Sequence, residues 1–107
     1  MDKYKIRLTK QAKEHLTLIR EYIVTELKAP SIAKQVLNLL KFEIYSLETM
    51  PQRFKCIEEV PWRDLGFRKF RVKNYYIYFQ IDDKKKEVQI IAIIYIKMDQ
   101  ERQLKNL

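Results

Sequence analysis

The spacing of hydrophobic positions divides the first part of the chain into a strand and a helix. At residues 3–8 apolar and basic residues alternate, which predicts a strand with one face in water. Thr9 follows, and its hydroxyl is expected to cap the helix that begins there. Apolar residues then recur every three or four positions, as in a helix with one buried stripe, at Ala12, Leu16, Ile19, Ile23 and Leu27.

A second helical stripe follows a short break. Because Pro30 disfavours helix at the residue before it, residues 29–31 are expected to end one helix and start another. Two amphipathic helices with so short a link predict an antiparallel helical hairpin. The second stripe stops before Pro51 and comprises Ala33, Val36, Leu37, Leu40, Ile44 and Leu47.

The second half of the chain is typical of strands. Residues 50–65 show no period and predict a loop, which Trp62 is expected to anchor. Residues 67–73 alternate, and residues 75–81 are mostly β-branched and aromatic, so both segments are expected to be strands. Residues 88–96 are apolar on both faces, as in a central strand that is covered from two sides.

These elements predict an α+β fold in one domain, residues 1–107. An N-terminal strand is followed by the helical hairpin, by a three-stranded, mostly antiparallel sheet, and by a short C-terminal helix at residues 99–107. The hairpin is expected to cover one face of the sheet. Basic side chains alternate with buried ones along the first of the three strands, so the opposite face is expected to carry Lys69, Arg71 and Lys73.

The charge balance favours an anionic partner. The chain of 107 residues carries 22 Lys and Arg against 14 Asp and Glu, a formal charge of +8, while 47% of its residues are hydrophobic. That composition supports a folded core and excludes compositional disorder. The partner of this positive charge could be a nucleic acid, an acidic protein or a lipid surface. The simpler interpretation is that the charge only keeps the protein soluble.

Single residues exclude several classes of site. The only cysteine, Cys56, has no partner for an internal disulfide and is expected to be a small buried residue in a reducing compartment. His15 is the only histidine and Gly66 the only glycine, so neither a metal site nor a glycine-rich phosphate loop is expected. The N-terminus lacks the apolar run of a signal peptide, and residues 88–96 are too few to span a bilayer, which favours the cytoplasm and no membrane partner.

Several local patterns, in this order and spacing, resemble the RelE/ParE family of toxins from type II toxin–antitoxin systems, and the resemblance covers nearly the whole chain. It rests on residues 12–23 (AKEHLTLIREYI), Pro30 with Ala33, residues 47–51 (LETMP), residues 70–75 (FRVKNY) with residues 77–79 (IYF), and residues 94–99 (IYIKMD) with Arg102 and Leu104.

The resemblance implies two mechanisms on one fold. RelE-like members cut mRNA in the ribosomal A site, whereas ParE-like members poison DNA gyrase without known hydrolysis of their own. Both kinds are held inactive by a cognate antitoxin that wraps around them. The resemblance therefore implies an antitoxin as partner, gyrase or the ribosome with its mRNA as target, no cofactor and no small-molecule substrate.

The RelE-like alternative needs groups that move protons and stabilise charge. Attack by the ribose 2′-hydroxyl requires a base, cations near the phosphorus and an acid for the leaving oxygen. By resemblance, Lys69, Arg71 and Lys97 would supply cations and Tyr95 a proton.

The ParE-like alternative is slightly favoured by departures from the RelE pattern. Tyr76 stands where the third strand of RelE-like enzymes usually carries Arg, Met98 where a catalytic Arg is expected, and Leu104 where a Tyr is expected. The length of the helical hairpin favours the same branch.

A basic and aromatic surface is the candidate for target binding in either case. Basic residues along a strand bind phosphate or an acidic surface, and tyrosines offer stacking faces and hydroxyls. A third alternative is a non-toxic basic nucleic-acid-binding module that uses the same surface. The expected target-binding residues are Arg53, Arg68, Lys73, Tyr76 and Tyr78.

Overall fold

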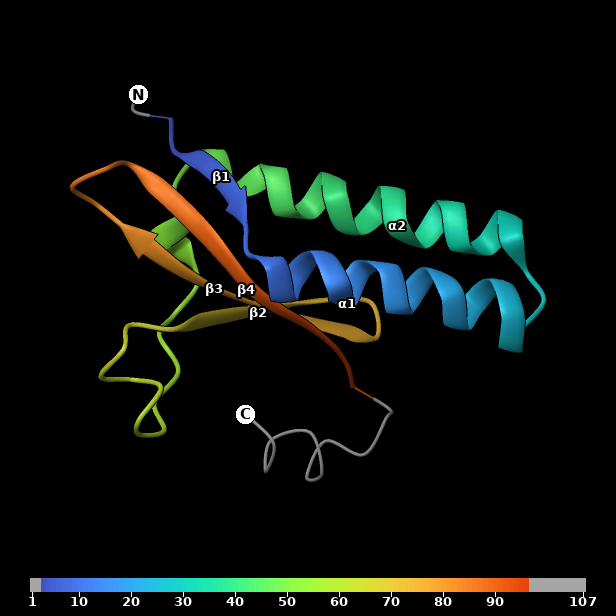
Figure 1. Cartoon of the computed structure of the whole chain (residues 1–107). Coiled ribbons are helices and arrows are strands. Elements are labelled where there is room, and N and C mark those ends of the chain that lie inside the picture. The colour runs from blue at the N-terminus through green and yellow to red at the C-terminus, as the bar shows by residue number, and fades with distance from the viewer. Residues whose placement is uncertain (1–2, 97–107) are drawn as a thin grey trace.

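The order of elements is that predicted from the sequence. The computed structural model describes residues 3–96, and Figure 1 shows a pair of helices lying against one side of a twisted sheet. The strands are β1 (Lys5–Leu8), β2 (Arg68–Val72), β3 (Tyr75–Asp82) and β4 (Glu87–Tyr95), and the helices are α1 (Lys10–Glu21) and α2 (Pro30–Tyr45), with a π-helical turn at Tyr22–Glu26 and 3-10 turns at Ser46–Glu48 and Pro51–Arg53.

The hairpin begins and turns where the sequence predicts. The Thr9 hydroxyl accepts a hydrogen bond from the backbone N–H of Ala12, which satisfies one free donor of the first turn of α1. The π-helical turn extends α1 by five residues, and Lys28 then adopts a left-handed conformation. Pro30 occupies the first turn of α2, where its missing N–H costs no helical hydrogen bond.

The sheet has four strands, not three, because β1 joins it. The strand order is β1-β4-β3-β2, with β1 parallel to β4 and the other neighbours antiparallel. The expected three-stranded sheet is corrected accordingly. The expected helix at residues 99–107 lies outside the described residues.

The main core lies between the hairpin and the inner face of the sheet. Leu40, Ile44 and Leu47 from the second helix and its end are almost fully buried against Ile77, Phe79, Val88 and Ile90 of the sheet. Burial of a side chain of this size contributes about 1.5–3 kcal/mol relative to exposure. A smaller cluster lies on the outer face of the sheet and is formed by Tyr78, Ala92 and Ile94.

A β-bulge in β4 explains why that strand is apolar on both faces. Tyr78 pairs with Ala92 and Phe79 with Ile90, so Ile91 is one extra residue on β4. The inward face therefore changes from even-numbered residues before the bulge to odd-numbered residues after it, and Ile93 joins the inner core. Ala92 and Ile94 thereby turn to the outer face.

Side chains of α1 and of its N-cap, Thr9, bond to the part of β4 where its pairing with β1 ends. The Thr9 hydroxyl donates to the carbonyl oxygen of Ile90 (2.8 Å), and Gln11 donates to that of Ile91 (3.1 Å). The backbone N–H of Ile93 donates to Nδ1 of His15 (3.0 Å). The edge of β4 is thus partly satisfied by the helix rather than by another strand.

Two further observations complete the fold. Cys56 is exposed, which corrects its expected burial. It lies in the loop that precedes β2 and forms an isolated antiparallel bridge with Arg68, the first residue of β2. No helix within residues 3–96 has the length and hydrophobicity of a membrane span.

The hydrogen bond from Ile93 predicts a pH-dependent stability. Partial burial lowers the pKa of His15, an effect that Glu14 partly opposes, and Nδ1 accepts only while the ring is neutral. Because the folded-state pKa lies below the unfolded value of about 6.5, the unfolded state binds more protons, and the free energy of unfolding should fall as the pH drops below that value. Urea denaturation at neutral and mildly acidic pH measures how the free energy of unfolding changes with pH. In His15→Gln, whose carbonyl accepts the same bond without titrating, the pH dependence should shrink; an unchanged dependence would contradict the assignment.

Candidate functional site

Four of the expected site residues meet on the outer face of the sheet, opposite the helical hairpin. Lys69 pairs across the strands with Tyr78, and Arg71 pairs with Tyr76. The ammonium group of Lys69 lies 4.6 Å from the ring centroid of Tyr76 and 6.0 Å from that of Tyr78, within the range of cation–π attraction. The two cations and Tyr76 therefore form one contiguous surface, with the largely buried Tyr78 (7% exposed) packed beside them.

Strand geometry explains which basic residues reach this surface. Along β2 the exposed Lys69 and Arg71 alternate with the buried Phe70 and Val72, as predicted. Lys73 lies beyond the strand, in the turn to β3, with a left-handed φ of 53°. Arg71 Nε donates to the carbonyl oxygen of Lys73 at 2.7 Å. The expected row of three cations is therefore a pair on the strand and a third at the turn.

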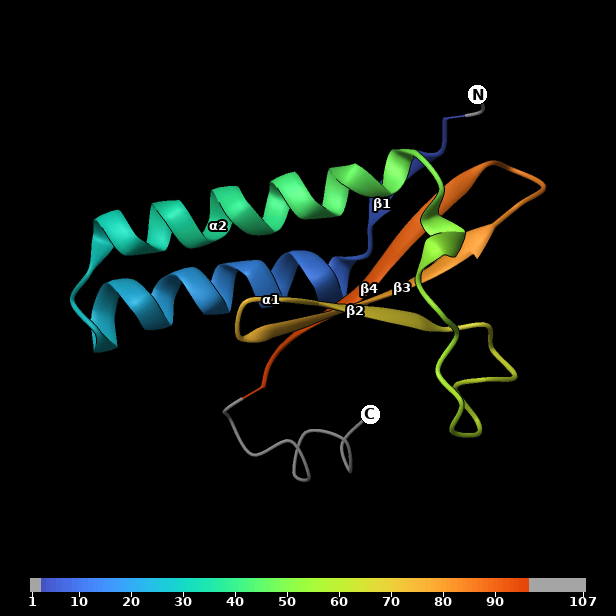
Figure 2. The ribbon, with the colours of Figure 1, turned by 180° about the vertical axis from the view of Figure 1, so that it is seen from behind.

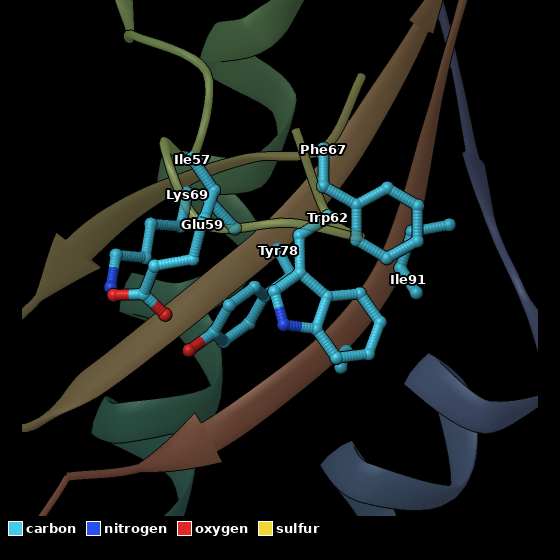
Figure 3. Close-up of a pocket in the computed structure, with 8 residues that line it drawn as sticks. Ile57, Glu59, Trp62, Phe67, Lys69, Tyr78 and Ile91 are labelled. Atoms are coloured by element: carbon cyan, nitrogen blue, oxygen red, sulfur yellow. The ribbon is translucent and has the colours of Figure 1, made fainter. Parts of the chain in front are cut away.

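The loop between α2 and β2 folds over part of the outer face and encloses a small hollow (Figure 3). Ile57 N–H donates to the carbonyl oxygen of Phe67 (2.8 Å), and the ring of Trp62 stacks on that of Phe67 with centroids 5.8 Å apart. Trp62 thus anchors the loop, as expected. The hollow is lined by Ile57, Glu59, Trp62, Phe67, Lys69, Tyr78, Ile91 and Ala92.

The tyrosine in this hollow is held protonated. Burial raises the pKa of Tyr78, and neighbouring Tyr76 and Glu59 raise it further. A phenol whose pKa lies above its ordinary value of about 10 is a poor general base near neutral pH. Tyr78 is therefore suited to donating a hydrogen bond or to packing.

Tyr95, the expected proton donor, lies on the inner face of the sheet. Its ring packs against that of Tyr75, with centroids 5.2 Å apart, and burial raises the pKa of Tyr75 further above that of an exposed phenol. The structure does not bring Tyr95 together with Lys69 and Arg71. Lys97, Met98 and Leu104 lie outside the described residues.

Arg53 and Arg68 are bonded into the fold rather than displayed on the outer face. Arg53 donates to the carbonyl oxygens of Thr49 (2.7 Å) and Met50 (3.1 Å). Arg68 lies on the core side of β2 and donates to the carbonyl oxygen of Phe54 at 2.6 Å. Both guanidinium groups therefore fix the loop between α2 and β2.

Within residues 3–96 no three side chains of His, Cys, Asp or Glu come together as a possible metal site. His15 contacts β4 through Ile93 and faces neither Lys69 nor Arg71. The surface can bind an anionic or hydrogen-bonding partner through its cations and phenols.

Comparison with known proteins identifies the family. The model of the ParE toxin of type II toxin–antitoxin systems matches residues 6–100. This chain belongs to the ParE toxin family. It is thus a type II toxin with the RelE/ParE fold.

Solved structures resemble this ParE-family toxin over almost its whole length. A chain of the chromosomal ParDE system of P. aeruginosa has a TM-score of 0.73 and 21% identity, covering 88% of this chain and 97% of the other. A chain of the RelBE2 toxin–antitoxin complex of Mycobacterium tuberculosis has a TM-score of 0.63 and 23% identity, and the match covers 89% of this chain and 93% of the other. A free E. coli RelE variant has a TM-score of 0.62 and 14% identity, and the match covers 98% of this chain and 98% of the other. A comparison with curated protein sequences gave no match.

Sequence reasoning missed the part of the candidate site that the loop contributes. Ile57 and Glu59 line the hollow although they come from the segment without period, and Phe67 is the first residue of the strand predicted at residues 67–73. The available signal was composition: this loop is rich in apolar residues, which indicates that part of it packs against the sheet.

The bonds of Arg68 predict a structural role. Arg68→Ala leaves the half-buried carbonyl of Phe54 without its charged donor, so the free energy of unfolding should fall by about 1.5–3 kcal/mol. Lys55→Ala, a neighbouring exposed cation, should change it by no more than about 0.5 kcal/mol. Urea denaturation compares the two, and equal stability of both variants would argue against the role.

Proposed function

We propose that this toxin arrests growth by binding DNA gyrase through the outer face of its sheet. Membership of the ParE family supports this target, since ParE-like members act on gyrase. Lys69, Arg71 and Tyr76 form the proposed contact surface, and Tyr78, which is only 7% exposed, is packed beside them. Arg and Tyr side chains are enriched at the centres of protein interfaces, where they combine hydrogen bonding with apolar contact area, and Lys69 adds a positive charge that attracts an acidic partner.

The observation that carries the proposal is the separation of the expected catalytic groups. A ribonuclease of this type needs a proton-transfer group within hydrogen-bond reach of the cations that hold the phosphate. Tyr95 packs on Tyr75 at the inner face, while Lys69 and Arg71 lie on the outer one. Of the phenols that remain beside the cations, Tyr78 has a raised pKa. The described surface is better suited to binding than to acid–base catalysis.

The alternative is ribosome-dependent mRNA cleavage. One contact favours it: the ammonium group of Lys69 lies 4.6 Å from the ring of Tyr76, so a cation and a phenol stand side by side. In that mechanism Tyr76 would take the role expected of Tyr95. A non-toxic nucleic-acid-binding module remains the third candidate, and the growth assay below separates it from the other two.

We also propose that a cognate acidic antitoxin binds the helical hairpin. The solved relatives include toxin–antitoxin complexes, and this chain is basic. The apolar run in β4 is largely buried by the toxin's own fold. Large apolar side chains instead remain exposed on the hairpin, and these are Leu18, Tyr22, Leu27, Ile32, Phe42 and Tyr45.

Removal of both outer-face cations should abolish toxicity. Lys69→Ala with Arg71→Ala should weaken inhibition of purified gyrase at least about tenfold, because both cations lie at the centre of the proposed interface. Growth after induction without antitoxin, followed by a supercoiling assay, measures this. Lys34→Ala with Lys41→Ala on α2 removes the same charge and should leave toxicity unchanged.

The pattern of arrest decides between targets. Broken DNA with an induced damage response supports gyrase, whereas truncated transcripts with intact DNA contradict it and support mRNA cleavage. Full toxicity of the Lys69/Arg71 double variant would remove the outer face from either mechanism. No growth defect from the wild-type chain would favour the non-toxic module.

A single exposed residue tests the antitoxin surface. The Phe42 side chain is 71% exposed, so Phe42→Ser should not reduce the free energy of unfolding, but it should weaken antitoxin binding about tenfold or more. Val60→Ser removes an apolar residue that is 59% exposed from the loop before β2 and should not affect binding. Titration calorimetry with the antitoxin compares the variants. Wild-type affinity of Phe42→Ser would argue against the hairpin as the contact.

A further inference from the structure

A second basic surface lies at one end of the sheet, apart from the outer-face site. The turn between β3 and β4 carries Lys84 and Lys85, and the start of β1 lies beside it, because the backbone N–H of Lys5 donates to the carbonyl oxygen of Lys86 at 2.8 Å. Figures 1 and 2 show from both sides that the N-terminal end of β1 and this turn occupy the same end of the sheet. We refer to Lys3, Lys5, Lys84 and Lys85 as the terminal lysine cluster.

The acidic residues of the turn are occupied by its own structure. The Asp82 carboxylate accepts from the backbone N–H groups of Lys84 and Lys85, both at 3.1 Å. The Asp83 carboxylate accepts from the Tyr4 hydroxyl at 2.8 Å and from Gln52 at 3.2 Å. Both carboxylates thus hold the turn in shape and anchor it to the rest of the fold.

The four lysines are exposed and held by an ordered backbone. None of them forms an ion pair with a carboxylate within the described part of the chain, and the nearby Glu87 pairs with Arg7 at 3.5 Å. The backbone beneath them is fixed by the β1–β4 pairing and by the Asp82 bonds. Segments about eighty residues apart in the sequence thereby bring four exposed lysines to the same end of the sheet.

We propose that the terminal lysine cluster binds the phosphodiester backbone of a nucleic acid. Lysine ammonium groups are point charges that match single phosphates, and such contacts carry affinity without reading sequence. An anionic membrane would also attract the charge, but stable surface binding there needs apolar side chains that insert. Neither β1 nor the turn contributes to the exposed large apolar side chains found among the described residues. This binding is independent of which target the toxin engages.

The test is the salt dependence of binding by the full chain, purified free of antitoxin. A fluorescent DNA duplex of about 20 base pairs serves as the probe, with anisotropy measured across a salt series. Lys84→Gln with Lys85→Gln should weaken binding at least about tenfold near 100 mM salt and reduce the slope of log K against log salt by about 2. Glutamine keeps the backbone donors to Asp82, so the turn is retained.

Charge-matched variants make the result specific. Lys34→Gln with Lys41→Gln removes two exposed charges from α2 and should leave the slope nearly unchanged. Equal losses in the two double variants would mean that only net charge matters and would overturn the proposal, as would loss of binding only with Lys69→Gln and Arg71→Gln. An RNA duplex of the same length tells whether DNA or RNA backbone is preferred, and either preference supports the cluster. Binding to anionic phosphatidylglycerol vesicles but to neither duplex would overturn it.

Discussion

The structure depends on β4 being held on all sides. Its first half pairs with β1 in parallel and its whole length pairs with β3 in antiparallel fashion, while the hairpin covers its inner face. An apolar strand of this kind, left open, would be a site for aggregation. Each covering element also acts on function: β3 carries the tyrosines of the outer face, and β1 brings the N-terminal lysines beside the β3–β4 turn.

Much of this arrangement could be predicted because it follows from local periodicity. The alternation of Lys69 and Arg71 with Phe70 and Val72 defines the open and buried sides of β2, and the structure agrees. The two helical stripes and the Thr9 cap follow from spacing and side-chain chemistry in the same way. Each of these features depends only on residues a few positions apart in the sequence, so it can be predicted from a single segment.

The remaining features depend on contacts between distant segments. Tyr95 turns inward because the bulge at Ile91 shifts the alternation of β4 by one residue, and nothing in the apolar run marks the position of that bulge. Arg68 is drawn to a loop carbonyl fourteen positions earlier in the sequence. Pairing of β1 with β4 spans most of the chain. A single-strand pattern carries no information on any of these partners.

The separation of apolar and charged residues has a consequence for function. Within residues 3–96 the buried set contains no charged side chain. In the Arg7–Glu87 pair the Arg7 side chain is 61% exposed and that of Glu87 14% exposed, while both side chains of the Arg63–Asp64 pair are exposed. An exposed pair such as Arg63–Asp64 contributes little to the free energy of unfolding. Stability therefore resides in the apolar layer between hairpin and sheet, while the surplus positive charge is left to the surface. Selection can alter the cations of the outer face and of the terminal lysine cluster without unfolding the toxin, so target affinity and stability are governed by separate parts of the molecule.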